Sequence, residues 1–211
     1  MTTHYPGAED FLPQRQNLAS LRSAVQDCRG CDLYATAIQA VFGEGLRRSR
    51  LIMIGEQPGD VEDHTGRPFT GPAGRLLDKA LVQAGIERSE VFLTNAVKHF
   101  RFRTRGATGK RRIHQTPSQS QVNACRPWLE AELDVVKPEG AVVLGSVAGK
   151  SIFGPDFTVG SHRGTVGELP GRPIWSVSTI HPSAALRAEN RAVLYEGLVA
   201  DLELAARTLA S

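Results

Sequence analysis

Three cysteines and one histidine have the residue types that bind metals. Cys28 and Cys31 form a Cys-x-x-Cys pair, and Cys125 lies much further along the chain. Such a pair is compatible with zinc, with an iron–sulfur cluster or with a redox-active dithiol. His99 is the best candidate for a fourth ligand, because His99 and Cys125 bracket the same basic segment and ligation by both would fix that segment at its base. An ordinary buried thiol at Cys125 fits the sequence equally well.

A second group of residues follows four short apolar segments that are expected to be strands. The residues that leave these segments are Glu56-Gln-Pro-Gly59, Asn95-Ala-Val-Lys98, Gly145 and His181-Pro-Ser183. In an open parallel sheet the ligand site lies beyond the carboxyl ends of the strands. We therefore expect these four exits to converge on one crevice.

The basic residues are concentrated in one part of the chain. The net charge is only +3, yet residues 91–129 contain no Asp or Glu. A cationic block on a mildly acidic remainder is typical of proteins that bind a polyanion, and nucleic acid is favoured over a membrane because no amphipathic apolar face accompanies it. A solvated basic loop is the alternative. The block contains eight basic residues: Lys98, Arg101, Arg103, Arg105, Lys110, Arg111, Arg112 and Arg126.

One segment resembles a phosphate-binding loop. Gly145-Ser-Val-Ala-Gly-Lys-Ser151 follows an expected strand and opens an expected helix. A P-loop requires four residues between its first glycine and the Gly-Lys pair, whereas three are present here and Leu144 occupies the position of the required glycine. A nucleotide-binding protein of this type is therefore a weak alternative.

The elements that position these residues alternate along the chain. Short apolar runs predict strands at 50–55, 91–95, 140–145 and 173–180, and periodic apolar residues predict helices at 18–25, 72–84, 117–133, 146–153 and 192–209. Residues 56–71 have the composition of a turn-rich connection. Strands separated by helices require crossover connections, so we expect an α/β fold with a mostly parallel four-stranded sheet and helices on both faces.

Length and composition limit the class of protein. The 211 residues are enough for one domain covering 1–211, with a flexible N-terminal arm over about 1–17 and a basic loop over about 100–116 that is the candidate for binding nucleic acid. Neither a membrane span nor a signal peptide is apparent, which predicts a cytoplasmic protein without membrane association. Three cysteines in such a compartment favour metal binding or reactivity over disulfides.

Several motifs taken together resemble the uracil-DNA glycosylase superfamily over nearly the whole chain. More narrowly, Gln57, His99 and the segment Lys110-Arg-Arg-Ile-His114 resemble UdgX proteins, which are related to the iron–sulfur family 4 enzymes but become covalently attached to DNA after removing uracil. The superfamily motifs are Gly55-Glu-Gln-Pro-Gly59, Gly66-Arg-Pro-Phe-Thr-Gly71, Thr94-Asn-Ala-Val-Lys98 and His181-Pro-Ser183.

This resemblance implies a fold and a cofactor. The fold is a three-layer α/β/α sandwich around a short parallel sheet. The cofactor is a structural four-iron four-sulfur cluster held by Cys28, Cys31, His99 and Cys125, although the same ligand set also suits zinc.

The resemblance also assigns roles to the strand-exit residues. Phe69 stacks on the base, and the amide of Asn95 pairs with uracil O4 and N3–H. His181 donates to uracil O2 as charge develops, and the carboxylate of Glu56 stabilises the cationic sugar. Gln57 contributes to uracil binding and orients His114 or the sugar. Each residue taken alone also fits an ordinary structural role.

His114 carries the most specific implication. In the UdgX pattern its imidazole replaces water as the nucleophile and attacks C1′ of the deoxyribose, so turnover is about one per molecule. An ordinary turnover glycosylase of family 4 type is the first alternative, and a non-enzymatic protein that binds nucleic acid or nucleotide is the second. The resemblance implies that the protein is a monomer and that its partner is uracil-containing DNA, single- or double-stranded. Free uracil is the implied product. The expected DNA contacts are Lys98, Lys110, Arg111, Arg112, Ser183 and Arg187.

Overall fold

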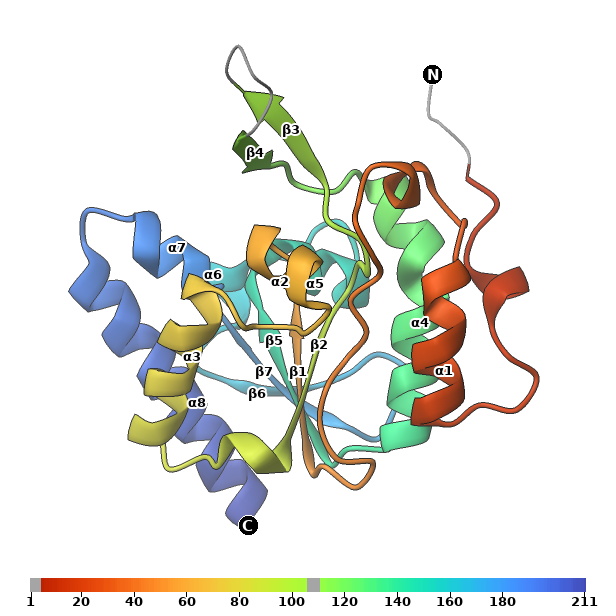
Figure 1. Cartoon of the computed structure of the whole chain (residues 1–211). Helices are drawn as coiled ribbons and strands as arrows, with labels where there is room; N and C mark the ends of the chain where they lie inside the picture. Colours follow the sequence, from red (N-terminus) through yellow and green to blue (C-terminus); the bar gives the residue numbers. More distant parts are fainter. Residues whose placement is uncertain (1–4, 106–110) are drawn as a thin grey trace.

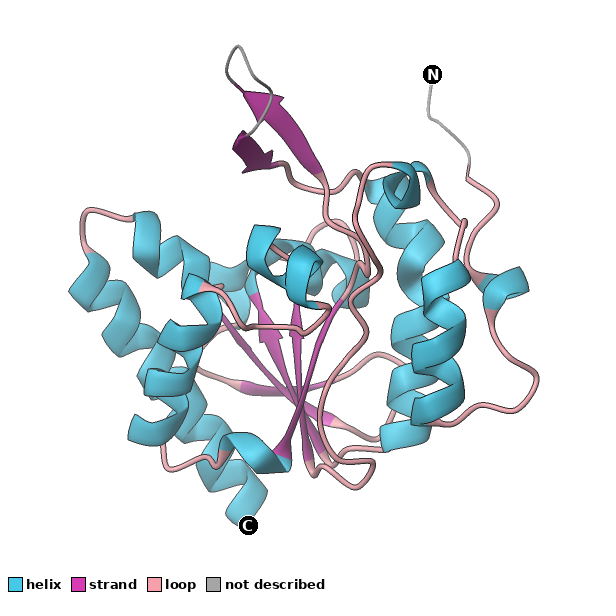
Figure 2. Cartoon of the chain, viewed as in Figure 1, coloured by secondary structure: helices cyan, strands magenta, loops and turns pink. Residues whose placement is uncertain are grey.

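The computed structural model describes residues 5–105 and 111–211 and shows a three-layer α/β/α sandwich. A five-stranded sheet in the order β2-β1-β5-β7-β6 lies between two layers of helices, as Figure 2 shows. The predicted fold class is confirmed, with one more strand than expected. The strands are β1 Leu51–Gly55, β2 Val91–Asn95, β5 Gly140–Leu144, β6 Val166–Glu168 and β7 Trp175–Thr179.

The four predicted strands form the parallel part of the sheet. All residues of β1, β2 and β5 are buried, because helices cover both faces. The fifth strand, β6, pairs antiparallel with β7 at the edge of the sheet. Sequence reasoning missed β6 because its three residues are exposed and form no apolar run.

Alternate strand residues face two different helical layers. Ile52, Ile54 and Phe92 belong to a core cluster that includes residues of α1, α4 and α5. Leu51 and Met53 point to the opposite face, where the core cluster includes residues of α3 and α8. Figure 1 shows these two layers on either side of the strands. The helices are α1 Leu18–Ala24, α2 Asp60–Thr65, α3 Pro72–Gln83, α4 Gln119–Val136, α5 Gly145–Phe153, α6 Val159–His162, α7 Pro182–Arg187 and α8 Arg191–Ala210, with short 3₁₀ helices at Glu9–Phe11, Val25–Asp27, Asp32–Ala35 and Arg88–Glu90.

The basic segment is a β-hairpin rather than a loop. Strand β3 (Phe102–Arg105) pairs antiparallel with β4 (Arg111–His114), and Phe102 lies opposite His114. The hairpin projects from the end of the main sheet at which the carboxyl ends of β1 and β2 lie (Figure 1). His114 therefore belongs to a strand with a defined register.

Residues 5–12, which belong to the predicted flexible N-terminal arm, contact the rest of the domain in the structure. Ala8 is fully buried, and the N–H of Gly7 donates to the carbonyl of Gly30 at 3.1 Å. Phe11 and Leu12 pack against the core beside α1. The polar composition of residues 1–17 concealed these few apolar contacts. Within the described residues, no helix has the length and apolar character needed to cross a membrane.

Candidate active site

The structure brings the predicted strand exits together at one end of the sheet. The N–H of Ala96 donates to the carbonyl of Gly55 at 2.9 Å, and the N–H of Val97 donates to the carbonyl of Glu56 at 3.0 Å, so the exits of β2 and β1 are bonded to each other. On the other side, Gly145 has φ +87° and lies so close to His181 that a Cβ there would be 2.8 Å from the His181 Cβ. Parallel strands place their carboxyl ends along one edge, and the predicted site residues lie at this edge.

Phe69 lies at this edge of the sheet in an unusual backbone conformation. Its φ is +56°, which a bulky residue adopts only when the surrounding structure imposes it. The buried carboxylate of Glu62 accepts hydrogen bonds from the N–H groups of Gly59 at 3.1 Å and Gly71 at 2.8 Å. These bonds connect the start of α2 to the end of the loop that follows it and carries Phe69. Gly74 contacts the Phe69 backbone at a distance that leaves no room for a side chain. Glu62 was not predicted as a site residue, because its partners are backbone groups that leave no local sequence pattern.

The Phe69 ring and the Asn95 amide meet above Gly55. A Cβ on Gly55 would collide with Asn95 Oδ1 and with the end of the Phe69 ring, so the glycine keeps this space open. The Phe69 ring is stacked at 6.3 Å from the His181 ring, with 29° between their planes. An aromatic ring, an amide and an imidazole therefore lie close together at this edge of the sheet, and these are groups that can stack on a flat heterocycle and bond to its polar edges.

His181 is held as a neutral hydrogen-bond donor. Its Nδ1 accepts the N–H of Ser183 at 3.2 Å and lies 2.8 Å from the Ser183 hydroxyl. Because Nδ1 accepts, the proton of the neutral ring resides on Nε2. Burial lowers the pKa of His181 to about 4, with smaller contributions from His114 and Arg187. Ser183 thus fixes the tautomer of His181, a role different from the predicted DNA contact.

His114 and Glu56 are in direct contact at the same edge of the sheet. The Nε2 of His114 lies 3.3 Å from Oε1 of Glu56. Burial raises the pKa of Glu56 to about 7, against the opposing influence of Arg187. Desolvation and the same arginine lower the pKa of His114, so its imidazole is neutral at physiological pH. A neutral imidazole beside a carboxyl group can act as a nucleophile while the carboxylate takes its proton.

Gln57 holds the base of the hairpin that carries His114. Its Oε1 accepts the N–H of Arg101 at 2.9 Å, and its Nε2 donates to the carbonyls of Arg101 at 3.2 Å and Gln115 at 3.0 Å. Both amide hydrogens are used in these bonds. This geometry leaves no amide hydrogen for the predicted contact with uracil, and the orientation of His114 by Gln57 stays a prediction.

Arg112 attaches the middle of the hairpin to α2. Its guanidinium contacts Asp60 and Asp63, each at 2.5 Å, and lies over the rings of Phe100 and Phe102 at 5.4 and 4.8 Å. Its side chain is only 13% exposed. Arg112 was predicted to contact DNA, but its charge is already compensated by two carboxylates, and its observed role is to dock the hairpin.

Lys98 is a second basic residue that the structure places away from solvent. Its side chain is fully buried, and its Nζ lies 2.7 Å from Oε2 of Glu132, which is also fully buried. The prediction that Lys98 contacts DNA is wrong, because the strand exit turns this side chain into the core.

The other predicted DNA contacts lie in different settings. Arg111 on β4 and Arg187 at the end of α7 are exposed, and Arg187 is close enough to act on the pKa values of Glu56, His114 and His181. Lys110 lies outside the described residues. Two further basic residues on β3, Arg103 and Arg105, are exposed and add to the positive charge of the hairpin.

The three cysteines are buried, free and close enough to influence one another. Burial raises the pKa of Cys31 to about 11 and that of Cys125 to about 12, and Cys28 adds to both effects. The indole N–H of Trp128 donates to Cys28 Sγ at 3.3 Å, and the Lys98 N–H donates to Cys125 Sγ at 3.2 Å. N–H donors of this kind stabilise thiolate ligands, so the donor set fits a metal-containing group.

His99, the predicted fourth ligand, is also buried, and burial lowers its pKa to about 4, which leaves the neutral imidazole that metals bind. Across residues 5–105 and 111–211, however, no three His, Cys, Asp or Glu side chains have the spacing of ligands to a single metal ion. The structure therefore brings the thiols into one region without forming the compact site that one zinc ion would need.

The near-match to a P-loop has no structural support. Helix α5 begins at Gly145 itself, directly after β5, so no phosphate-sized loop separates the strand from the helix. Gly145 instead allows the close approach of His181 described above. A nucleotide-binding loop at this position is therefore ruled out by its geometry.

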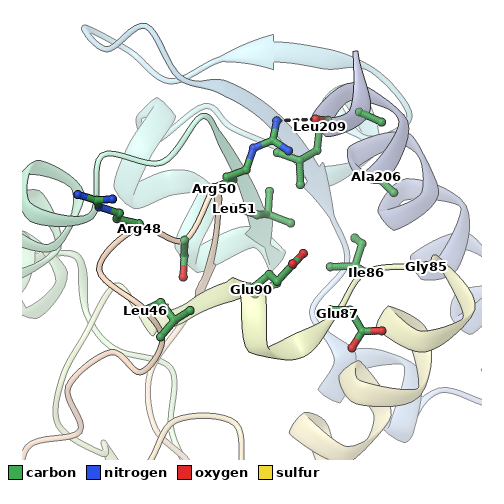
Figure 3. Close-up of a pocket in the computed structure, with 13 residues that line it drawn as sticks. Leu46, Arg48, Arg50, Leu51, Gly85, Ile86, Glu87, Glu90, Ala206 and Leu209 are labelled. Carbon is green, nitrogen blue, oxygen red and sulfur yellow. Dashed lines mark hydrogen bonds between the residues drawn. The ribbon is translucent and has the colours of Figure 1, made fainter.

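A cavity of about 340 Å³ lies at the opposite end of the sheet (Figure 3). Leu51 and Val91, which begin β1 and β2, line it together with residues from the end of α8. None of the predicted site residues borders this cavity. We therefore place the active site at the carboxyl ends of the strands, where the chemically useful side chains meet.

The cationic hairpin is suited to attract phosphates, and the aromatic ring, amide and imidazole at the carboxyl ends of the strands are suited to contact a base taken out of the stack. The model of the protein family described as "Uracil DNA glycosylase superfamily" matches residues 42–203 of this chain. The chain belongs to this superfamily.

Several curated proteins similar to this chain are type-4 uracil-DNA glycosylases. The protein from Sulfurisphaera tokodaii is 32% identical over 200 residues, covering 90% of this chain and 85% of its own. The protein from Thermotoga maritima is 33% identical over 169 residues, covering 77% and 80%. The protein from Archaeoglobus fulgidus is 30% identical over 177 residues, covering 81% and 84%.

Proposed function

We propose that the chain is a uracil-DNA glycosylase that removes uracil from DNA and then becomes covalently attached to the deoxyribose through His114, as UdgX proteins do. Membership of the superfamily and the type-4 relatives support the glycosylase activity. The observation that carries the covalent step is the 3.3 Å separation between His114 Nε2 and Glu56 Oε1.

In this reaction uracil leaves the base stack and lies against Phe69, with its O4 and N3–H edge toward the Asn95 amide. The Nε2–H of His181 donates to uracil O2 as the glycosidic bond lengthens and its electron pair moves onto the base. The sugar becomes an oxocarbenium-like cation beside the carboxylate of Glu56. A neutral His181 is the suitable donor, because it strengthens its hydrogen bond as negative charge grows without having to transfer its proton.

The nucleophile is the imidazole of His114. Its Nε2 forms the bond to C1′ while the Nε2 proton passes to Glu56, and the base departs as the uracil anion, which then takes up a proton. In a hydrolytic enzyme, the carboxylate would orient a water molecule at this place. Here the imidazole occupies the position next to the carboxylate, and the bonds of Gln57 and Arg112 hold it there.

We further propose that Cys28, Cys31, His99 and Cys125 hold a four-iron four-sulfur cluster. When bound, this cluster supplies a structural link between the N-terminal segment, the base of the hairpin and α4, and no step of the reaction passes through it. Iron and sulfide analysis, with visible absorption at the blue end of the spectrum, measures its presence. A zinc-containing, colourless protein would contradict this assignment.

The decisive experiment uses a labelled single-stranded oligonucleotide with one deoxyuridine. After incubation, boiling in detergent and electrophoresis, we expect a labelled band shifted by the mass of the protein, and no such band with a thymidine oligonucleotide. We expect His114→Ser to admit water, to lose the band and to release uracil over many turnovers. A stable adduct formed by His114→Ser would show that the nucleophile is another residue.

Ordinary turnover hydrolysis of the type-4 kind is the second candidate, favoured by the names of the relatives. It predicts alkali-labile strand breaks without any shifted band in the same experiment.

A further inference from the structure

A fully buried ion pair lies directly behind the residue assigned to read uracil. The Nζ of Lys98 donates to the backbone carbonyl of Asn95 at 2.7 Å, to Thr94 Oγ1 at 2.8 Å and to Glu132 Oε2 at 2.7 Å. An ammonium group has three hydrogens, so these three acceptors satisfy it completely. Lys98 is three residues beyond Asn95, and its side chain folds back to cap the carbonyl of the reading residue itself.

The carboxylate of Glu132 is satisfied in the same closed manner. It accepts from Lys98 Nζ and from Thr94 Oγ1 at 2.7 Å, and from the N–H of Gly43 at 2.9 Å. At Gly43 a Cβ would collide with the Phe92 ring and lie 2.8 Å from Glu132 Oε1, so this contact requires a glycine. Glu132 belongs to α4, the helix that also carries Cys125.

This network fixes the peptide unit that follows the Asn95 side chain. The carbonyl of Asn95 accepts from Lys98, and the N–H of Ala96, on the other side of the same peptide bond, donates to Gly55 at 2.9 Å. The peptide plane is therefore held at both ends. Since the backbone determines the direction of the Cα–Cβ bond, the network fixes the point and direction from which the Asn95 side chain extends.

The energetic cost of the pair argues for a positional role. Two charges removed from water lose more hydration than their mutual attraction commonly restores, and well-packed apolar residues often serve stability equally well or better. Such a pair is nonetheless useful where a polar backbone group must be held in one direction. Here the group so held is the carbonyl of Asn95.

We propose that Lys98 and Glu132 are positioning residues that set the uracil specificity of the site by orienting Asn95. This inference rests on the proposed glycosylase function, in which Asn95 reads the base. It implies that the pair acts on recognition of the base and not on attraction of the DNA backbone, which the exposed arginines of the hairpin supply.

The test compares two affinities of the full-length protein, one for free uracil and one for an oligonucleotide without uracil. The variant is Lys98→Met with Glu132→Gln, which removes both charges together, keeps similar side-chain volumes and leaves an amide oxygen for the Gly43 N–H. We expect free uracil to bind about tenfold more weakly and the single-turnover rate of excision to fall at least as much, while binding of the uracil-free oligonucleotide is unchanged. Glu130→Gln is the matched control, because Glu130 is on the same helix and pairs with Arg172 at the surface.

A folded double variant with the uracil affinity of the wild type would overturn the proposal, and so would equal losses for both ligands. Should the double variant fail to fold, Thr94→Val decides instead. It preserves the side-chain volume but removes the hydroxyl that accepts a hydrogen bond from Lys98 and donates one to Glu132. We expect a severalfold loss of uracil affinity from Thr94→Val, and no loss would contradict the role. A wild-type protein that neither binds nor excises uracil would instead reject the proposed function.

Discussion

Replacing Glu56 by Gln should stabilise the protein at neutral and alkaline pH while removing its activity. Burial raises the pKa of Glu56 from 4.5 to about 7 in the folded state. The folded protein therefore holds this proton more tightly than the unfolded chain does, and ionisation of Glu56 costs stability. Its contribution is fully retained below about pH 4.5 and is lost as the pH rises through about 7.

The magnitude follows from the size of this pKa change. A pKa difference between 4.5 and about 7 corresponds to about 3 kcal/mol above pH 7 and to less than about 1 kcal/mol at pH 5. A glutamine has no charge to bury, so Glu56→Gln should avoid this cost. We expect the variant to exceed the wild type in free energy of unfolding by up to about 3 kcal/mol at pH 8, and to approach it at pH 5.

The assay is urea denaturation of both proteins at pH 5, 6.5 and 8, monitored by intrinsic fluorescence. Glu203→Gln is a suitable control, because Glu203 is partly exposed on α8 and its pairing with Arg207 at 3.9 Å is loose. A difference between Glu56→Gln and wild type that is the same at all three pH values would refute the reasoning. So would a variant that is less stable at pH 8.

Two further changes test the site. His181→Ser should leave DNA affinity unchanged and slow excision by about 10²- to 10³-fold, because it removes a donor to the developing charge on O2, and single-turnover release of uracil measures this; an unchanged rate would exclude His181 as the donor. Gln57→Ala should lower the ratio of covalent adduct to released uracil at least tenfold, because three hydrogen bonds at the base of the hairpin are lost. The control for this ratio is Gln119→Ala on the surface of α4, and an undiminished ratio in Gln57→Ala would show that Gln57 does not orient His114.

The sequence predicted the elements whose signal is local. The strands at 51–55, 91–95 and 140–144 are continuous apolar runs because both of their faces are buried, and such runs are recognisable without a structure. Strand β6 and helix α2 lack this signal. The first is an exposed three-residue edge strand, and the second is six residues long and begins with acidic residues whose partners lie elsewhere in the chain.

The misassigned residues are those whose partners are remote in sequence. Lys98 pairs with a residue 34 positions away and Arg112 with residues 52 and 49 positions away, so their charges appeared free for DNA. An unpaired cation and a buried, paired one have the same sequence signature. Strand-exit motifs, in contrast, predicted that Glu56, Asn95 and His181 lie at one edge of the sheet, because a parallel sheet itself brings such exits together.

The position of His114 depends on the β1 exit more than on the hairpin. Glu56 faces the imidazole, and the next residue, Gln57, holds both ends of the hairpin through backbone bonds. Helix α2, which begins three residues further on, supplies the carboxylates that bind Arg112. The carboxylate and the groups that place its partner therefore belong to one short continuous segment.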